Sequence, residues 1–342
     1  MDLTKVSKYT KLFSKIHGKC QTEPMVVSDG SFIYWYAKDE EIIIKSDHVY
    51  EFAKNTLAEE DQVSTLSCAN GKIFSLCTDV LIEHSHYIRR LFKQKKKKDL
   101  NISLENFTSK TVDKLITYFR YGIICFRLDT VANLIKISKA LELSHFIYLL
   151  EASLICNADN SLKTLVYCIN LFATTDNLIT VRSKNVLIAL TNYKLVDLLA
   201  TKKFIELSPA SLVYLLANDD LQVADEVDVF RIAMYYIVHQ KNYQYSDSIL
   251  NVVRFNNTTK DELAEIKEIV KEYDDSFITS VMTQFYEDLE SETPSLNDSV
   301  IVHRNSHNLS YRNSGDGTIT AIIGQLQHNL LHYSETQTPL YK

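Results

Sequence analysis

The sequence predicts an α+β protein: a small sheet with helices in the N-terminal part, followed by an all-α helical domain. Short runs with β-type composition around Asp-Gly and Asn-Gly turns occur only in the first hundred or so residues. Between residues 155 and 290, apolar residues follow helical spacing. Seven glycines and four prolines in 342 residues are too few for a β-propeller, a collagen or a disordered linker protein.

Composition restricts the class of partner. The chain is 46% hydrophobic and carries 37 basic against 43 acidic residues, a net charge of −6. This balance gives no reason to expect nucleic acid or a membrane as partner. The N-terminus lacks the apolar segment of a secretory signal, and no run of 18 apolar residues occurs. Six cysteines without a CxxC pair indicate reduced thiols, so we expect a cytoplasmic or nuclear protein.

Residues 1–46 form a predicted N-terminal extension with short strands. Two β-prone runs, 25–27 and 31–36, flank the turn at Asp29-Gly30, and residues 42–44 are a candidate third strand. Three short strands are marginal alone and need another element to pack on.

Residues 47–154 alternate helices and strands. Apolar spacing predicts helices at 49–57, 79–92, 109–121 and around 131–141. A hairpin with an Asn70-Gly71 turn joins strands 63–68 and 72–74, and residues 100–104 are a further strand. Gly122 ends the third helix at the position where a left-handed residue is favoured.

Residues 155–290 are predicted to be entirely helical, with helices at 162–174, 178–191, 209–217, 226–239, 261–271 and 277–289. The third of these begins with Ser208 as N-cap and Pro209 at the first helical position. From residue 291 to 342 the chain is rich in Ser, Asn and Thr, which predicts a polar, flexible C-terminal tail.

The stretch from Lys72 to Phe92, KIFSLCTDVLIEHSHYIRRLF, resembles the BTB/POZ signature of a hairpin ending in Phe, a Val-Leu pair opening a helix, and a Ser-x-Tyr continuation. The segments ISL at 102–104 and LITYFRYG at 115–122, and ALEL at 140–143, fit the rest of that family's order. Cys77 stands where the family has His, and Ser64 where it has Asp. The resemblance implies a BTB/POZ domain over 47–154.

Residues 155–290 resemble the BACK domain that follows BTB in Kelch-like proteins. The most specific pieces are FIELS at 204–208, DDLQV at 219–223 and VVRF at 252–255. Tyr236 replaces the Trp that often ends one BACK helix. Nothing resembling Kelch repeats follows, and the remaining length is too short to hold a propeller.

The resemblance implies a homodimer through the first BTB helix, which in this family packs against the partner's copy. Its apolar side chains here are Val49, Phe52, Ala53 and Leu57. The alternative is that the same residues pack in the core of one chain.

The resemblance also implies contact with cullin-3, through the loop at 91–100, Tyr121 and the first BACK helices. The residues concerned are Leu91, Phe92, Tyr121, Leu165 and Phe172. The hydrophobic-x-Glu motif that many BTB adaptors place in this loop is absent, and five lysines stand within residues 93–98 instead. This run is either a solvated loop or a site for phosphate, RNA or a nuclear-import receptor.

A protein client needs a surface outside the shared BTB and BACK bodies. Tyr34, Trp35 and Tyr36 form an aromatic run, the kind of side chain enriched in binding hot spots. The alternatives are that this strand packs on the BTB sheet, or that the tail from Ser291 binds the client.

The sequence gives no support for catalysis, and we predict no enzyme activity, no cofactor and no metal site. His84 and His86 are two apart on a predicted helix, so their side chains diverge. Two functions remain open: a BTB-BACK substrate adaptor of a cullin-3-type ubiquitin ligase, and a dimeric scaffold or regulatory protein that binds no cullin.

Overall fold

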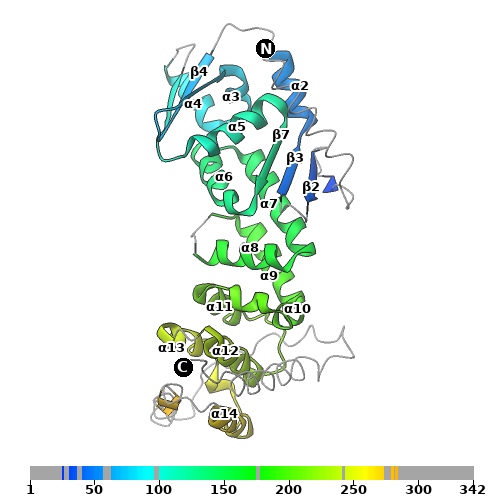
Figure 1. The fold of residues 1–342 in the computed structure, drawn as a ribbon, viewed down its shortest axis with the longest axis vertical. Helices are drawn as coiled ribbons and strands as arrows, with labels where there is room; N and C mark the ends of the chain where they lie inside the picture. Colours follow the sequence, from blue (N-terminus) through cyan, green and yellow to red (C-terminus); the bar gives the residue numbers. More distant parts are fainter. Residues whose placement is uncertain are drawn as a thin grey trace, which may run out of the picture. The chain divides into compact units, whose positions relative to one another are not determined.

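The computed structural model describes residues 25–26, 31–36, 41–56, 63–95, 100–174, 178–240, 243–272, 279–280 and 282–283. The chain divides into two compact units. The first comprises Met1–Thr164 and Asn177–Ser183, and the second comprises Leu165–Asp176 and Lys184–Lys342. The first unit is α+β and the second is helical, as the sequence predicts (Figure 1).

One sheet of the first unit joins the N-terminal strands to a strand far along the chain. Its order is β1-β2-β3-β7, all antiparallel, with strands β1 (Met25–Val26), β2 (Phe32–Tyr36), β3 (Glu41–Lys45) and β7 (Ile123–Arg127). The three predicted N-terminal strands are confirmed, and β3 pairs with β7, a strand that the sequence analysis missed. Ile42 and Ile44 of β3 are fully buried. Residues up to 46 therefore contribute to the core of the unit.

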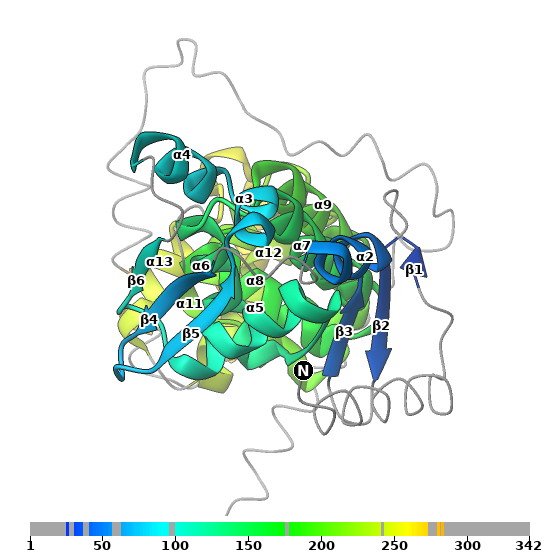
Figure 2. The ribbon, with the colours of Figure 1, turned by 90° about the horizontal axis from the view of Figure 1, so that it is seen from above.

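The second sheet has the order β5-β4-β6, with strands β4 (Val63–Cys68), β5 (Ile73–Cys77) and β6 (Asn101–Leu104). Strands β4 and β5 form the predicted hairpin, and Gly71 takes a φ of 72° in its turn. Strand β6 runs parallel to β4. In Figure 2 this hairpin lies on one side of α5 (Ser109–Tyr121), and strands β2 and β3 lie on the other.

Helix α5 packs against several elements of the first unit. It contacts α2 (Asp47–Thr56), strand β7 and strand β5. Gly122 ends α5 in the left-handed conformation, with a φ of 62°, as predicted. A Cβ on Gly122 would overlap the carbonyl oxygen of Ser46 and come within 2.8 Å of the Tyr50 backbone. Glycine is therefore required both by the turn and by the approach of α2.

The predicted helix 79–92 is two helices, α3 (Thr78–His84) and α4 (His86–Lys95). The break falls at Ser85, because the Ser85 hydroxyl donates to the carbonyl oxygen of Leu141 at 2.5 Å and accepts the backbone N–H of Ile88 at 3.0 Å. A side chain that caps a new helix in this way ends the previous one. Helix α6 (Leu128–Ala140) was predicted, whereas α7 (Ser144–Asn160) was missed.

Every described element of the second unit is a helix. They are α8 (Leu162–Thr174) and α9 (Val181–Tyr193), each of which begins within the residue range of the first unit, then α10 (Leu195–Leu199), η1 (Lys202–Glu206), α11 (Pro209–Leu216), α12 (Glu226–Gln240), η2 (Tyr243–Tyr245), α13 (Ser246–Leu250), η3 (Phe255–Asn257) and α14 (Lys260–Glu272). Ser208 caps α11 as predicted, accepting the N–H of Ser211. Helix α12 forms the centre of this unit, and its Tyr236 hydroxyl donates to the Leu207 carbonyl at 2.6 Å.

The remaining segment predictions fall partly outside the described residues. Of the predicted helix 277–289 only four positions are described, and the tail 291–342 is not described. The boundary predicted between residues 154 and 155 lies within α7. The four-part domain division stays a prediction.

Candidate interaction site

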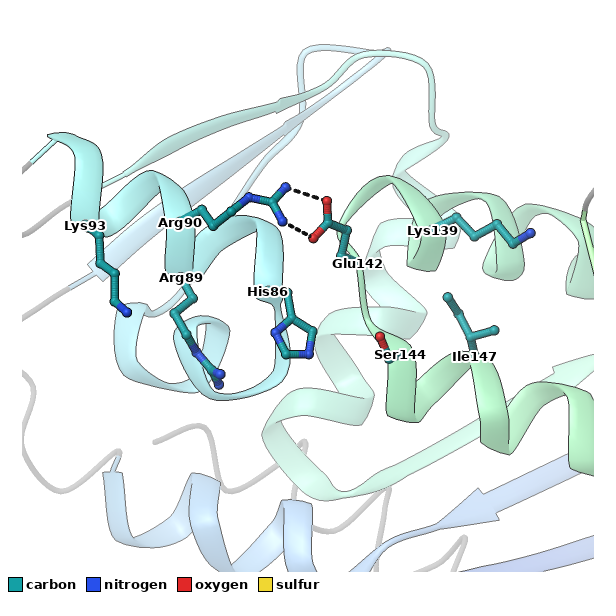
Figure 3. A pocket seen from close by; sticks show the side chains of 8 residues that line it. All are labelled: His86, Arg89, Arg90, Lys93, Lys139, Glu142, Ser144 and Ile147. Atoms are coloured by element: carbon teal, nitrogen blue, oxygen red, sulfur yellow. Dashed lines mark hydrogen bonds and ion pairs between the residues drawn. The ribbon is translucent and has the colours of Figure 1, made fainter. Parts of the chain in front are cut away.

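A cavity of about 480 Å³ opens between α4 and the turn that joins α6 to α7. Its wall is made mainly of charged side chains from two segments far apart in the sequence: His86, Arg89, Arg90, Lys93, Lys139, Glu142, Ser144 and Ile147. Figure 3 shows Arg89 and Lys93 extending from the same side of α4, while Ser144 and Ile147 come from the start of α7. All eight residues belong to the first unit.

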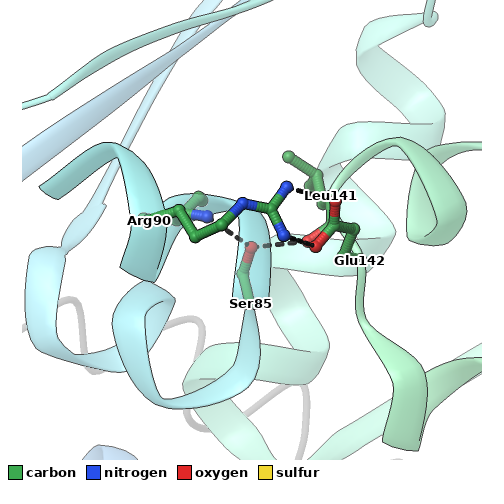
Figure 4. Close-up of polar contacts among 5 residues, drawn as sticks. Ser85, Arg90, Leu141 and Glu142 are labelled. Carbon is green, nitrogen blue, oxygen red and sulfur yellow. Dashed lines mark hydrogen bonds and ion pairs between the residues drawn. The ribbon is translucent and has the colours of Figure 1, made fainter. Parts of the chain in front are cut away.

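Helix α4 is held against this turn by contacts that begin at Ser85. The Ser85 hydroxyl bonds to Leu141, and the backbone N–H of His86 donates to the Glu142 carbonyl at 3.5 Å. Ser85 itself is fully buried. Its hydroxyl fixes the position at which α4 begins and the wall of the cavity that α4 supplies (Figure 4).

Arg90 and Glu142 close the same junction with a bidentate ion pair. The two guanidinium nitrogens lie 2.6 and 2.5 Å from the two carboxylate oxygens. Hydrogen bonding from Arg90 holds the pKa of Glu142 below its usual value, and the same bond raises the pKa of Arg90. Glu142 has a φ of 52°, a left-handed conformation that a non-glycine residue adopts at a cost.

The Arg89 guanidinium contacts the C-terminal end of the preceding helix, α3. Its Nε donates to the carbonyl of Ile82 at 3.1 Å, and its Nη2 donates to the carbonyl of Glu83 at 2.9 Å. A cation at the C-terminal carbonyls of α3 stabilises that helix. Arg89 also lies 4.0 Å from the Glu83 carboxylate, an exposed pair, and it borders the cavity.

The lysine run predicted as a loop begins inside a helix. Lys93 and Lys95 are the last turn of α4, and Lys93 is exposed and lines the cavity. Residues 96–99 lie outside the described residues. The structure therefore connects the first lysine of the run to a shaped site.

The predicted dimer helix exists as α2, but its apolar residues differ in exposure. Val49 and Ala53 are fully buried, Phe52 is half-buried, and Leu57 lies outside the described residues. The exposed aromatic residue of this helix is Tyr50, at 41%. Of the predicted apolar residues that the structure describes, Val49 and Ala53 have no surface to offer, so the exposed apolar surface of α2 comes from Tyr50 and Phe52.

The residues predicted to contact cullin-3 differ in exposure. Leu91, Phe92 and Tyr121 are half-buried. Leu165 has no exposed surface, and Phe172 retains 6%. Within the second unit the Phe172 ring packs edge-on against Tyr214 at 5.3 Å, and the Lys184 ammonium lies over both rings. Leu165 and Phe172 therefore serve packing in the structure.

Tyr34, Trp35 and Tyr36 lie on β2, opposite Ile43, Ile42 and Glu41 of β3 in the antiparallel register. The strand pair belongs to the same sheet as β7. This placement matches the alternative in which β2 completes the sheet, and the client-binding role stays a prediction.

His84 is the most perturbed histidine of the described residues. Its ring stacks on Phe119 at 5.4 Å and meets Phe52 edge-on at 5.8 Å. Burial lowers its pKa from 6.5 to about 4. His86 faces the cavity instead, so the two histidines diverge as predicted. Within the described ranges, no three His, Cys, Asp or Glu side chains group as a metal site.

Two further observations bear on chemistry. Burial raises the pKa of the Cys125 thiol to about 12 and raises that of Cys168 as well, so neither is a nucleophilic thiolate at neutral pH. Of the helices that the structure describes, none combines the length and apolar character needed to cross a bilayer.

Sequence reasoning missed the cavity because its wall comes from two distant segments. One local signal was present: His86, Arg89, Arg90 and Lys93 follow the i, i+3, i+4, i+7 spacing of one helix face. That spacing predicts a basic helix face, but only the turn at residues 141–144 makes it a cavity.

Comparison with known families places two domains on the chain. The sequence model of the BTB/POZ domain matches residues 55–158. The model described as BTB And C-terminal Kelch, abbreviated BACK, matches residues 168–268. No protein with a curated description matches the chain.

Proposed function

Because this chain is a BTB-BACK protein without a matched Kelch repeat, we propose that it is a non-enzymatic adaptor that dimerises and recruits a client to a cullin-3-type ubiquitin ligase. The observation that carries the proposal is the presence of both domains in the order typical of Kelch-like adaptors. BTB and BACK domains are protein-interaction modules, and protein–protein interaction is the function common to them.

A pull-down with the cullin-3 N-terminal domain tests the ligase role. The adaptor proposal expects stoichiometric capture of the cullin fragment by the full chain. Tyr121→Ala should weaken capture by about 2 kcal/mol, the cost typical of a lost aromatic hot spot. Tyr193→Ala is the matched control, since Tyr193 is an exposed tyrosine on α9 in the second unit. No capture by the wild-type chain would reject the ligase role.

Dimerisation is proposed through the exposed side of α2. Tyr50 and the half-buried Phe52 supply the apolar surface that a self-complementary contact needs. Light scattering after size exclusion should give twice 39.3 kDa. Tyr50→Glu should shift the protein to monomer, whereas Tyr148→Glu, at a tyrosine of similar exposure on α7, should not.

The second candidate function is a dimeric scaffold that binds no cullin. It is favoured by the lysines at 93 and 95–98, which occupy the place of the hydrophobic-x-Glu motif. A basic segment offers no apolar anchor to a cullin helix. Retained dimerisation together with absent cullin capture would support this function over the first.

The client is proposed to bind at the aromatic run of β2, with the tail after residue 290 as the competing site. Deleting residues 1–46 is unsuitable as a test, because β3 supplies the buried Ile42 and Ile44. Proximity labelling should therefore compare the wild-type chain, Trp35→Ala and a chain ending at residue 290. An unchanged partner list for Trp35→Ala would reject the β2 site.

A further inference from the structure

We propose that the cavity between α4 and the α6–α7 turn binds an acidic segment of a protein partner. The proposal rests on the charge and shape of this cavity in the first unit. Lys93 of its wall also lies in the 91–100 loop of the proposed cullin contact, so peptide binding and cullin capture are measured separately. The ligand chemistry is a set of carboxylate side chains beside a small apolar group.

The charge of the wall is the first argument. Four permanently cationic side chains line the cavity, namely Arg89, Arg90, Lys93 and Lys139, and one carboxylate, Glu142, opposes them. The wall therefore carries a net charge of about +3 on a chain whose total is −6. A local cluster of one sign opposite to the rest of the protein attracts and orients a ligand of the other sign.

Arg89 and Lys93 supply the positive charge on the α4 side of the cavity. Glu142 is occupied by Arg90 in a bidentate pair, so it does not neutralise the others. Arg89 donates to two backbone carbonyls and lies 4.0 Å from the Glu83 carboxylate, so its charge is balanced only in part. Lys93 extends from the exposed end of α4 on the same side as Arg89 (Figure 3). Arg89 and Lys93, one helical turn apart, therefore form a cationic edge that a carboxylate-rich segment can follow.

The remaining wall favours a peptide over a phosphate or a nucleic acid. Ile147 supplies an apolar contact and Ser144 a hydroxyl, and a volume of about 480 Å³ exceeds the size of one inorganic anion. Nucleic-acid sites combine an extended basic groove with aromatic stacking platforms. The only ring among the eight lining residues is that of His86.

The site is formed before a ligand arrives. Ser85 with Leu141, His86 with Glu142, and Arg90 with Glu142 all tie α4 to the turn that carries the opposite wall (Figure 4). A wall fixed in this way loses little conformational entropy on binding.

Fluorescence anisotropy with a short labelled peptide rich in Glu and Leu tests the proposal on the full chain. The peptide should bind, its Gln-for-Glu counterpart should not, and added salt should weaken binding. Lys93→Glu should lower the affinity about tenfold, because it replaces an attractive charge by a repulsive one. Lys110→Glu is the matched control, since Lys110 is an exposed lysine of α5 that does not line the cavity.

A second variant, Ser144→Asp, distinguishes a loss of peptide binding from a loss of folding. An acidic residue in the first turn of α7 favours that helix, yet it places a carboxylate at the cavity. This variant should keep its thermal midpoint and lose peptide affinity. The proposal is overturned if the acidic peptide does not bind, if neither variant weakens it, or if inorganic phosphate or an oligothymidylate displaces it at equal concentration.

Discussion

Both units bury a hydrogen-bonded carboxylate, Glu151 in the first and Asp228 in the second, but they differ in where further charges gather. In the first unit, cations gather on the surface around a cavity. In the second unit, two carboxylates enter the interior at the start of α12: Glu226 is 8% exposed and Asp228 only 1%. Glu226 accepts the backbone N–H of Arg254 at 3.0 Å, and Asp228 lies 3.3 Å from the Arg231 guanidinium.

This difference separates charges that serve the fold from charges that are available to a ligand. The buried carboxylates lie at the N-terminal turn of α12, where the helix dipole favours anions, and each has a partner in its own unit. The cations of the cavity border solvent. We therefore expect substitutions at the cavity to change binding and substitutions in the interior to change stability.

The largest expected effect is a loss of folding stability when a side chain is added at Gly122. Gly122→Ala should destabilise the fold by about 3 kcal/mol or more, because the new Cβ overlaps Ser46 and the residue keeps a positive φ. Gly71→Ala is the matched control, since its φ is 72° and nothing lies within 4 Å; it should cost about 1 kcal/mol. Urea unfolding measures both. Equal costs would show that the approach of α2 to Gly122 is unimportant.

Acid should weaken the first unit through His84. Burial lowers the pKa of His84 to about 4, helped by His145 and His48 and opposed by Glu83. The unfolded chain therefore takes up a proton below about pH 6.5 that the folded chain refuses down to about pH 4. Stability falls as the pH falls through this window.

The loss between pH 7 and pH 5 should be about 2 kcal/mol. His84→Phe, which keeps an aromatic ring between Phe52 and Phe119, should remove most of this pH dependence. Urea unfolding at the two pH values measures it. An unchanged slope in the variant would assign the acid sensitivity to another group.

Asp228 should give the opposite sign in the second unit. Burial raises its pKa above 3.8, reinforced by Asp225 and opposed by Arg231. The folded chain then binds a proton before the unfolded chain does, so this group gains stability as the pH falls. Asp228→Asn should stabilise the protein at pH 7 by about 1 kcal/mol and remove this gain. Destabilisation at pH 7 would mean that the pair with Arg231 outweighs the burial cost.

The smallest effect concerns Glu142. Glu142→Ala should lower the thermal midpoint, because it removes the pair with Arg90 and leaves a side chain at positive φ. Glu142→Gly should lower it less, since glycine adopts this conformation freely. The order of the two midpoints by circular dichroism checks this. The reverse order would show that the conformation of residue 142 costs nothing.

Elements with local signals were predictable from the sequence. Helix α5 begins after the capping Thr108 and ends at Gly122, and the β4–β5 hairpin turns at Asn70-Gly71. Their start, end and spacing depend on neighbouring residues alone, so the sequence contains what determines them.

The elements that were missed depend on distant partners. The cause of the break at Ser85 is the Leu141 carbonyl, 56 positions later. Residues 123–126 form an apolar run too short to distinguish strand from helix until β3 pairs with it. The cavity likewise needs α4 and the start of α7 together. The helical spacing of residues 86–93 contained a signal for the basic face of α4, but nothing local indicated its opposite wall.

The pairing of β3 with β7 has a consequence for how the chain folds. Ile42 of β3 pairs with Phe126 of β7, 84 positions later. During synthesis β3 is therefore complete before the strand with which it pairs on this edge. Closing so long a loop is slow compared with forming local helices and hairpins. Until then the EIIIK segment presents an unpaired apolar edge, which is the kind of segment that aggregates. We expect chains truncated before residue 127 to be captured by chaperones, even though all of β3 is present.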